Sequence, residues 1–154
     1  IKELEGIRAS AAINTAVLDH VANHIHAGMS TEEINTLVHD FTVAHGAIPA
    51  PLNYEGFPKS VCTSLNNEIC HGIPSPDIIL KEGDIVNVDV STIYKGYFSD
   101  SSRMYCIGKV DEEKEKQKKV DAAMDSIRSK YGMGKIVRGS VMKNSMNVGK
   151  KFNH

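Results

Sequence analysis

Apolar and polar residues alternate between positions 84 and 107, and this pattern predicts two β-strands that fold back on each other. In residues 85–90 the valines fall on one face of the first strand and Asp89 falls on the other. In the return strand, Asp100 lies in the middle of a run of serines. Each strand therefore carries one carboxylate near its centre.

The turn between these strands fixes which residues face each other. We place its centre at Tyr94 and Lys95, with Gly96 easing the bend, so that residues whose numbers sum to 189 are paired. Asp89 then lies directly opposite Asp100. Two like charges at that position destabilise a sheet, and a divalent cation between them is the simplest explanation for their presence.

Helical periodicity precedes this hairpin. The first apolar stripe repeats at spacings of four and three residues, with Asn14 as its one polar member: Ile7, Ala11, Asn14, Leu18, Val21 and Ile25. Gly28 follows this stripe and ends the predicted helix. A second helix begins at Ser30, where Glu33 completes a capping box, and Gly46 ends it. Its apolar stripe consists of Ile34, Leu37, Val38 and Phe41. We expect these helices to cover one face of a sheet, which makes an α+β fold.

The remaining segments connect these elements. Residues 48–58 are rich in proline and glycine and predict an irregular loop, in which Tyr54 and Phe57 either line a pocket or simply pack. Residues 59–65 are typical of a strand, and residues 111–131 of a third helix.

Length and composition indicate one main domain. The 154 residues are 41% hydrophobic, with no apolar run long enough to span a membrane and no visible targeting segment. The chain starts at Ile1 inside a helical pattern, which suggests a trimmed or processed N-terminus. Three cysteines without a CxxC pair favour a reducing, cytoplasmic setting, or three buried thiols: Cys62, Cys70 and Cys106.

Charge divides the chain near residue 120. Residues 121–154 carry a net charge of +5 and the first 120 residues carry −6, although the whole chain is close to neutral at −1. We therefore expect a domain of residues 1–120 followed by a basic helical tail.

The aspartate pair is the strongest candidate for metal chemistry. Carboxylate oxygens suit Mn²⁺ or Mg²⁺, and an imidazole from His71 would extend the choice to Co²⁺, Fe²⁺ or Zn²⁺. The alternative is a pair of strand-end carboxylates, of which neighbouring serines cap one and the other is exposed. Spacing alone leaves both interpretations open.

Other candidate sites carry weaker signals. His20 and His24 lie four residues apart, as metal ligands can, but the glutamate of a zincin motif is missing and surface histidines are the simpler explanation. Cys62 and His71 suggest a thiol nucleophile, although nothing in the sequence brings them together. The chain has no GxSxG motif, Walker loop or dinucleotide-binding glycine motif.

Four segments together resemble type I methionine aminopeptidases. They are residues 54–64 (YEGFPKSVCTS), 70–74 (CHGIP), 83–90 (GDIVNVDV) and 96–104 (GYFSDSSRM), and the likeness covers residues 1–120 in order and spacing. The resemblance implies half of a pita-bread fold and cleavage of N-terminal methionine from proteins and peptides. That family uses divalent metal, whether cobalt, manganese, iron or zinc.

The resemblance also implies roles for individual residues. Asp89 and Asp100 would bind the metals, and His71 would contact the substrate and stabilise the reacting amide. The pocket for the methionine side chain would be lined by Tyr54, Phe57 and Cys62.

One departure from the family pattern limits the expected activity. The family's second half supplies a histidine from a GHGIG-like motif and two glutamates, and none of these motifs follows Gly108. Two of the five expected metal ligands are present, so we expect a weak or inactive peptidase. A homodimer cannot supply the missing residues, but it could bring four aspartates together.

The basic tail suggests a second class of function. Residues 120–142 faintly resemble the C-terminal end of Y-family DNA polymerases, and the alternative is a basic helix with a disordered end. A chimeric fragment, or a binding module whose tail contacts nucleic acid or a protein, is therefore the alternative to an aminopeptidase.

Overall fold

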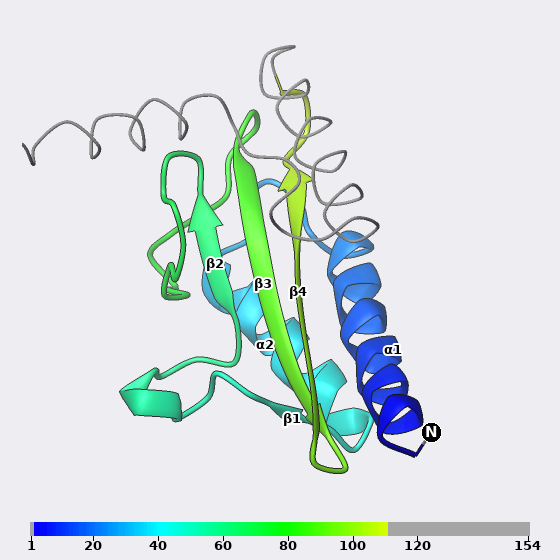
Figure 1. Ribbon diagram of the computed structural model, residues 1–154. Helices are drawn as coiled ribbons and strands as arrows, with labels where there is room; N and C mark the ends of the chain where they lie inside the picture. Colours follow the sequence, from blue (N-terminus) through cyan, green and yellow to red (C-terminus); the bar gives the residue numbers. More distant parts are fainter. Residues whose placement is uncertain (1, 111–154) are drawn as a thin grey trace, which may run out of the picture. The chain divides into compact units, whose positions relative to one another are not determined.

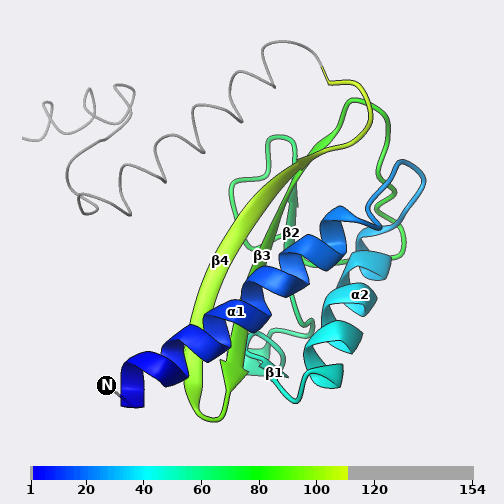
Figure 2. The ribbon, with the colours of Figure 1, turned by 90° about the vertical axis from the view of Figure 1, so that its right-hand side faces the viewer.

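The computed structural model describes residues 2–110, and this part of the chain is an α+β domain, as the sequence predicts. Two helices lie on one face of an antiparallel sheet (Figures 1 and 2). The elements are α1 (Lys2–Ala22), α2 (Thr31–Ala44), β1 (Ile48–Pro49), the 3₁₀ turn η1 (Tyr54–Gly56), β2 (Cys62–Leu65), β3 (Ile85–Tyr94) and β4 (Tyr97–Cys106). The third helix and the basic tail predicted above lie outside the described residues.

β3 is the central strand of the sheet. β4 pairs along its whole length, while β2 pairs with its first half and β1 with its last residues. The valines of β3 point toward the helices and are almost completely buried, whereas the residues between them are half-buried. The faces predicted from the alternation of residues are therefore confirmed.

The predicted register of the hairpin is wrong by two residues. Asp89 lies opposite Ser102, and Asp100 lies opposite Ser91. The two-residue turn is Lys95-Gly96, and both residues have positive φ (50° and 81°), as in the mirror-image turns that match strand twist. The aspartates are consequently diagonal neighbours on one face, a relation that typically separates side chains by about 7–8 Å.

The stripe predicted for α1 is confirmed in its middle, where Asn14, Leu18 and Val21 are buried, and is wrong near its start. There Ile7 is 48% exposed and Ser10 is buried instead; the helix ends at Ala22, well before Gly28. The side chains of Ser10 and Asn14 hydrogen-bond to the half of the hairpin that lies nearer its turn. Polar residues are therefore favoured there over aliphatic ones.

The predicted boundaries of α2 are confirmed. The Ser30 side chain accepts a hydrogen bond from the Glu33 amide (3.2 Å), the Glu33 carboxylate accepts one from the Ser30 amide (2.7 Å), and Gly46 follows the last turn with φ of 69°.

Two connecting segments differ from their predictions. The expected strand at 59–65 begins only at Cys62, because the Ser60 amide donates to the Asn35 side chain (2.8 Å) rather than to another strand. The expected irregular loop at 48–58 contains β1 and η1.

Candidate metal and substrate site

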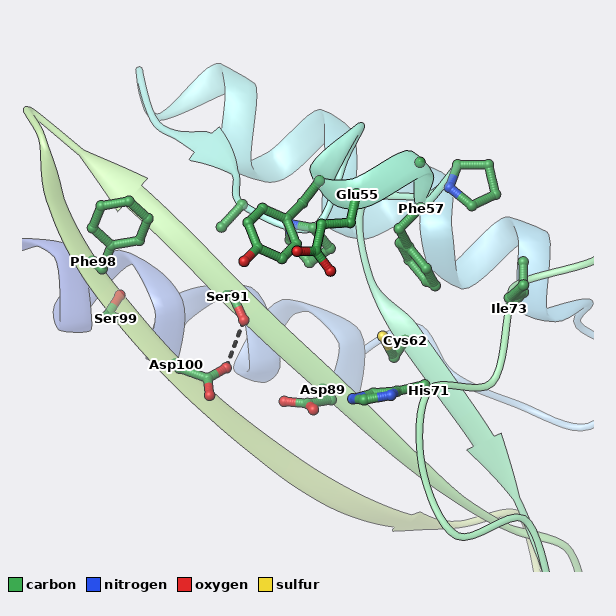
Figure 3. A pocket seen from close by; sticks show the side chains of 15 residues that line it. Glu55, Phe57, Cys62, His71, Ile73, Asp89, Ser91, Phe98, Ser99 and Asp100 are labelled. Carbon is green, nitrogen blue, oxygen red and sulfur yellow. Dashed lines mark hydrogen bonds between the residues drawn. The ribbon is translucent and has the colours of Figure 1, made fainter.

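An open pocket of about 820 Å³ lies on the face of the hairpin that is turned away from the helices (Figure 3). β2, β3, β4 and the loops around η1 and His71 contribute its walls. All six residues that the sequence singles out line this pocket: Tyr54, Phe57, Cys62, His71, Asp89 and Asp100. Three strands and two loops thus bring these residues together in one place.

The two aspartates lie in different local environments. Asp100 is exposed and accepts a hydrogen bond from the Ser91 hydroxyl (2.6 Å). Asp89 is half-buried, and no hydrogen bond to its carboxylate is found among the described residues. Burial raises the pKa of Asp89, the charge of Asp100 raises it further, and His71 lowers it. A carboxylate that is crowded by a second one and lacks a donor is suited to a cation.

Ser91 is a site residue that the sequence reasoning did not name. It follows Asp89 by two positions, so strand alternation alone places both on the same face. Its hydrogen bond to Asp100 agrees with the interpretation in which a serine caps one of two structural carboxylates. Such a hydrogen bond can equally orient a carboxylate that binds a metal. The geometry is compatible with both interpretations.

His71 is held in an uncommon backbone conformation. Its φ is 58°, and the carbonyl of the following Gly72 accepts a hydrogen bond from the Thr63 amide of β2 (2.9 Å). A Cβ atom on Gly72 would lie 2.0 Å from the Thr63 carbonyl oxygen, so only glycine fits there. This close approach places the exposed His71 ring beside Asp89 (Figure 3).

Cys62 lies opposite Asp89 in the β2–β3 register. Burial raises the pKa of its thiol to about 11, with Asp89 as the next cause. A reactive cysteine needs a lowered pKa, so the thiol-nucleophile alternative gains no support. The neutral thiol instead forms part of the pocket wall.

The apolar wall of the pocket includes residues beyond those predicted. Phe57 is half-buried and Tyr54 is 67% exposed, and the structure adds Ile73 and Phe98, both also exposed. Phe98 shares its face with Asp100 two positions later, a signal that the strand pattern contained.

His20, near the end of α1, and His24, in the turn that follows it, belong to a separate cluster. The rings of His20 and His24 lie 4.3 Å apart, and His20 stacks on Phe41, which stacks on His45. Burial and these neighbouring histidines lower the pKa of His20. Within residues 2–110, no group of three or more His, Cys, Asp or Glu side chains is placed to hold a metal ion. This is true of the histidine cluster and of the pocket.

Comparison with known proteins decides the family. A sequence model of metallopeptidase family M24 matches residues 5–140. The chain belongs to this family. The M24 match continues beyond residue 120, where the charge changes, and the boundary between domain and tail stays a prediction.

Methionine aminopeptidases are among the relatives of this M24 chain. The enzyme of Rickettsia prowazekii is 49% identical over 109 residues, which cover 71% of this chain and 42% of the relative. That of Buchnera aphidicola from Schizaphis graminum is 36% identical over 160 residues, covering 97% of this chain and 60% of the relative. The chain spans about half the length of the curated relatives it matches.

The fold agrees with this assignment. The crystal structure of the Rickettsia prowazekii enzyme superimposes with a TM-score of 0.78 and 44% identity, covering 80% of this chain and 49% of that one. The M24 chain therefore has the fold of half of a pita-bread protein, as predicted. None of these comparisons supports the polymerase resemblance, which falls on residues outside the described part. No helix in residues 2–110 has the length and apolar character needed to cross a bilayer.

Proposed function

We propose that this M24 chain provides the substrate-pocket wall and two metal ligands of a methionine aminopeptidase, which cleaves N-terminal methionine from peptides and nascent proteins. The observation that carries the proposal is the meeting of two carboxylates, a histidine and an apolar wall in one pocket. A cytoplasmic location is part of this proposal.

Asp89 and Asp100 would hold the divalent metal, which we take to be cobalt, manganese, iron or zinc. Their oxygens, the absence of a donor to the Asp89 carboxylate within residues 2–110, and the raised pKa of Asp89 all suit a cation. When bound, such a cation supplies polarisation of the peptide carbonyl and ionisation of an attacking water.

His71 would act on the substrate from the other side of Asp89. Its exposed ring reaches into the pocket from a backbone that Gly72 fixes. An imidazole N–H in that position would donate a hydrogen bond to the reacting amide and stabilise the charge that develops on it.

The apolar wall would receive the methionine side chain. An unbranched thioether fits irregular apolar space and makes favourable sulfur–aromatic contacts, here with Phe57. The neutral Cys62 thiol adds a small, weakly polar surface. A charged side chain would lose its hydration there without gaining a partner.

We expect the chain to be a weak or inactive peptidase when it acts alone, because two carboxylates do not complete a metal site. Pairing of two copies would bring four aspartates together, and this homodimer remains part of the proposal.

Hydrolysis of a Met-Ala-Ser peptide with added Co²⁺ or Mn²⁺ tests the expected competence. With the Rickettsia prowazekii enzyme run in parallel, we expect a rate for this chain below about 1% of that enzyme's, because loss of metal ligands removes most of the electrostatic stabilisation. Comparable turnover would contradict the view that the ligand set is incomplete.

Binding of a Met-Ala dipeptide, followed by amide NMR shifts, tests the pocket independently of turnover. We expect shifts at Phe57, Cys62 and His71, which Cys62→Phe abolishes by filling the pocket. Cys70→Phe is the matched control, because Cys70 is exposed and does not line the pocket. Equal binding of Met-Ala by both variants would contradict the proposed site.

A further inference from the structure

A single buried side chain of α1 lies directly behind the two aspartates. Asn14 is 1% exposed and lies on the helix face that packs against β3 and β4. Both aspartates point to the opposite face of the hairpin, into the pocket. We propose that Asn14 is a positioning residue, which fixes the separation and orientation of Asp89 and Asp100 from behind the sheet.

The contacts of Asn14 bridge both strands of the hairpin. On β3 its amide nitrogen donates to the Val90 carbonyl (2.7 Å) and to the Thr92 hydroxyl (3.2 Å). On β4 the same nitrogen reaches the Ser99 carbonyl (3.4 Å), and its oxygen accepts a hydrogen bond from the Ser101 hydroxyl. One side chain thus holds two points on each strand.

These contact points flank the aspartates in sequence. Val90 follows Asp89, while Ser99 and Ser101 stand on either side of Asp100. Alternate residues of a strand point to opposite faces, so the neighbours of each aspartate face the helix. Hydrogen bonds from Asn14 to these neighbours therefore fix the position of the backbone that carries each carboxylate.

Ser10 strengthens the same connection one turn earlier in α1. Its hydroxyl donates to the Thr92 carbonyl (3.1 Å) and lies 2.7 Å from the Ser99 hydroxyl. On the pocket side, the Ser91 hydroxyl joins β3 to the Asp100 carboxylate. The hairpin is therefore tied across its strands on both faces at the level of the aspartates.

This arrangement has a consequence for ligand binding. Two carboxylates at diagonal positions repel each other, and a flexible hairpin would let them separate. Residues that hold metal ligands in place, without touching the metal, typically change metal affinity about 10–100-fold when they are replaced. The predicted effect on metal rests on the proposed function, whereas the effect on hairpin geometry does not.

Two variants and one control test the positioning role. Asn14→Ala removes all the bridging contacts, and Ser101→Ala removes one of them at an exposed position that does not threaten folding. Thr42→Val is the control, because Thr42 is equally buried and hydrogen-bonds within α2, to the Val38 carbonyl.

The first readout is amide hydrogen exchange at Thr92 and Ser99, which form a hydrogen-bonded pair of the β3–β4 ladder, compared with amides of α2. We expect exchange at the hairpin to accelerate at least about tenfold relative to α2 in Asn14→Ala and measurably in Ser101→Ala, while Thr42→Val leaves the hairpin unchanged. Acceleration that is equal in the hairpin and α2 would mean only a loss of global stability, and would overturn the proposal.

The second readout is the dissociation constant for Mn²⁺, measured by electron paramagnetic resonance of the free ion. We expect about a tenfold weaker affinity in Asn14→Ala, a smaller loss in Ser101→Ala and less than about a twofold change in Thr42→Val. Equal losses in Asn14→Ala and Thr42→Val would overturn the proposal. If the parent chain binds no Mn²⁺, the proposed function fails, and hydrogen exchange alone decides the role of Asn14. If Asn14→Ala does not fold, Ser101→Ala decides it.

Discussion

The two faces of the β3–β4 hairpin share one backbone and carry opposite chemistry. On the helix side, Val86 and Val88 are completely buried in the core with residues of α1 and α2. On the pocket side, Asp89 is half-buried and Asp100 is exposed. Burial of the valines on the helix side therefore stabilises the fold, whereas the two neighbouring carboxylates on the pocket side destabilise it.

The largest expected effect follows from moving a charge to the wrong face. Val88→Asp would bury a carboxylate without a partner, which costs more than about 4 kcal/mol and should abolish the cooperative thermal transition. Asn87→Asp places the same side chain one position earlier, on the half-buried pocket face. It should change the free energy of unfolding by less than about 1 kcal/mol. A folded Val88→Asp protein would contradict the assignment of faces.

The faces were predicted correctly from the sequence because strand alternation is local, whereas the register was predicted wrongly. The register depends on which two residues form the turn. Because the turn was predicted at Tyr94-Lys95, the aspartates were predicted to lie directly opposite each other. Gly96 at the second central position of a mirror-image turn was the available signal for Lys95-Gly96.

The helix stripe shows a similar limit. Periodicity included Asn14 only as a polar interruption of the stripe and favoured the exposed Ile7 over Ser10, whereas Ser10 and Asn14 are both buried. Their burial depends on polar atoms of β3 and β4, which are more than 75 residues away in the chain. Likewise, the six candidate residues were known from motifs, but their meeting in one pocket required the fold.

The turn offers a second way to sharpen the comparison, because it sets which residues of the two strands face each other. Gly96→Ala forces a side chain into φ of 81° and should lower the free energy of unfolding by about 1 kcal/mol, as chemical denaturation would measure. Lys95→Asn should instead raise the free energy of unfolding by about 0.5 kcal/mol, because the Asn-Gly pair is favoured in this type of turn. Equal effects of both changes would indicate that the turn does not set the register.

The smallest expected effect comes from relieving the crowding of the carboxylates. In the metal-free protein the pKa of Asp89 is raised above its ordinary value of 3.8. Below that pH the carboxyl is protonated in both states and imposes no penalty. As the pH rises through the folded-state pKa, the unfolded state has already released its proton, so stability falls.

Asp89→Asn should therefore remove this decline and raise the free energy of unfolding at pH 7 by about 0.5 kcal/mol, a value discounted for solvent screening. Urea unfolding at acid and neutral pH measures it. Asp40→Asn, at an exposed position of α2, is the matched control and should show a smaller gain. A loss of stability in Asp89→Asn would mean that the carboxylate has a stabilising partner in the metal-free protein.

Titration of the parent chain with Mn²⁺ or Co²⁺, beside Asp89→Ala, Asp100→Ala and the control Asp40→Ala, tests the central claim most directly. We predict saturable binding by the parent and by Asp40→Ala, and at least about a tenfold weaker binding when either pocket aspartate is removed. Equal metal uptake by all four proteins would contradict the assignment of Asp89 and Asp100 as metal ligands.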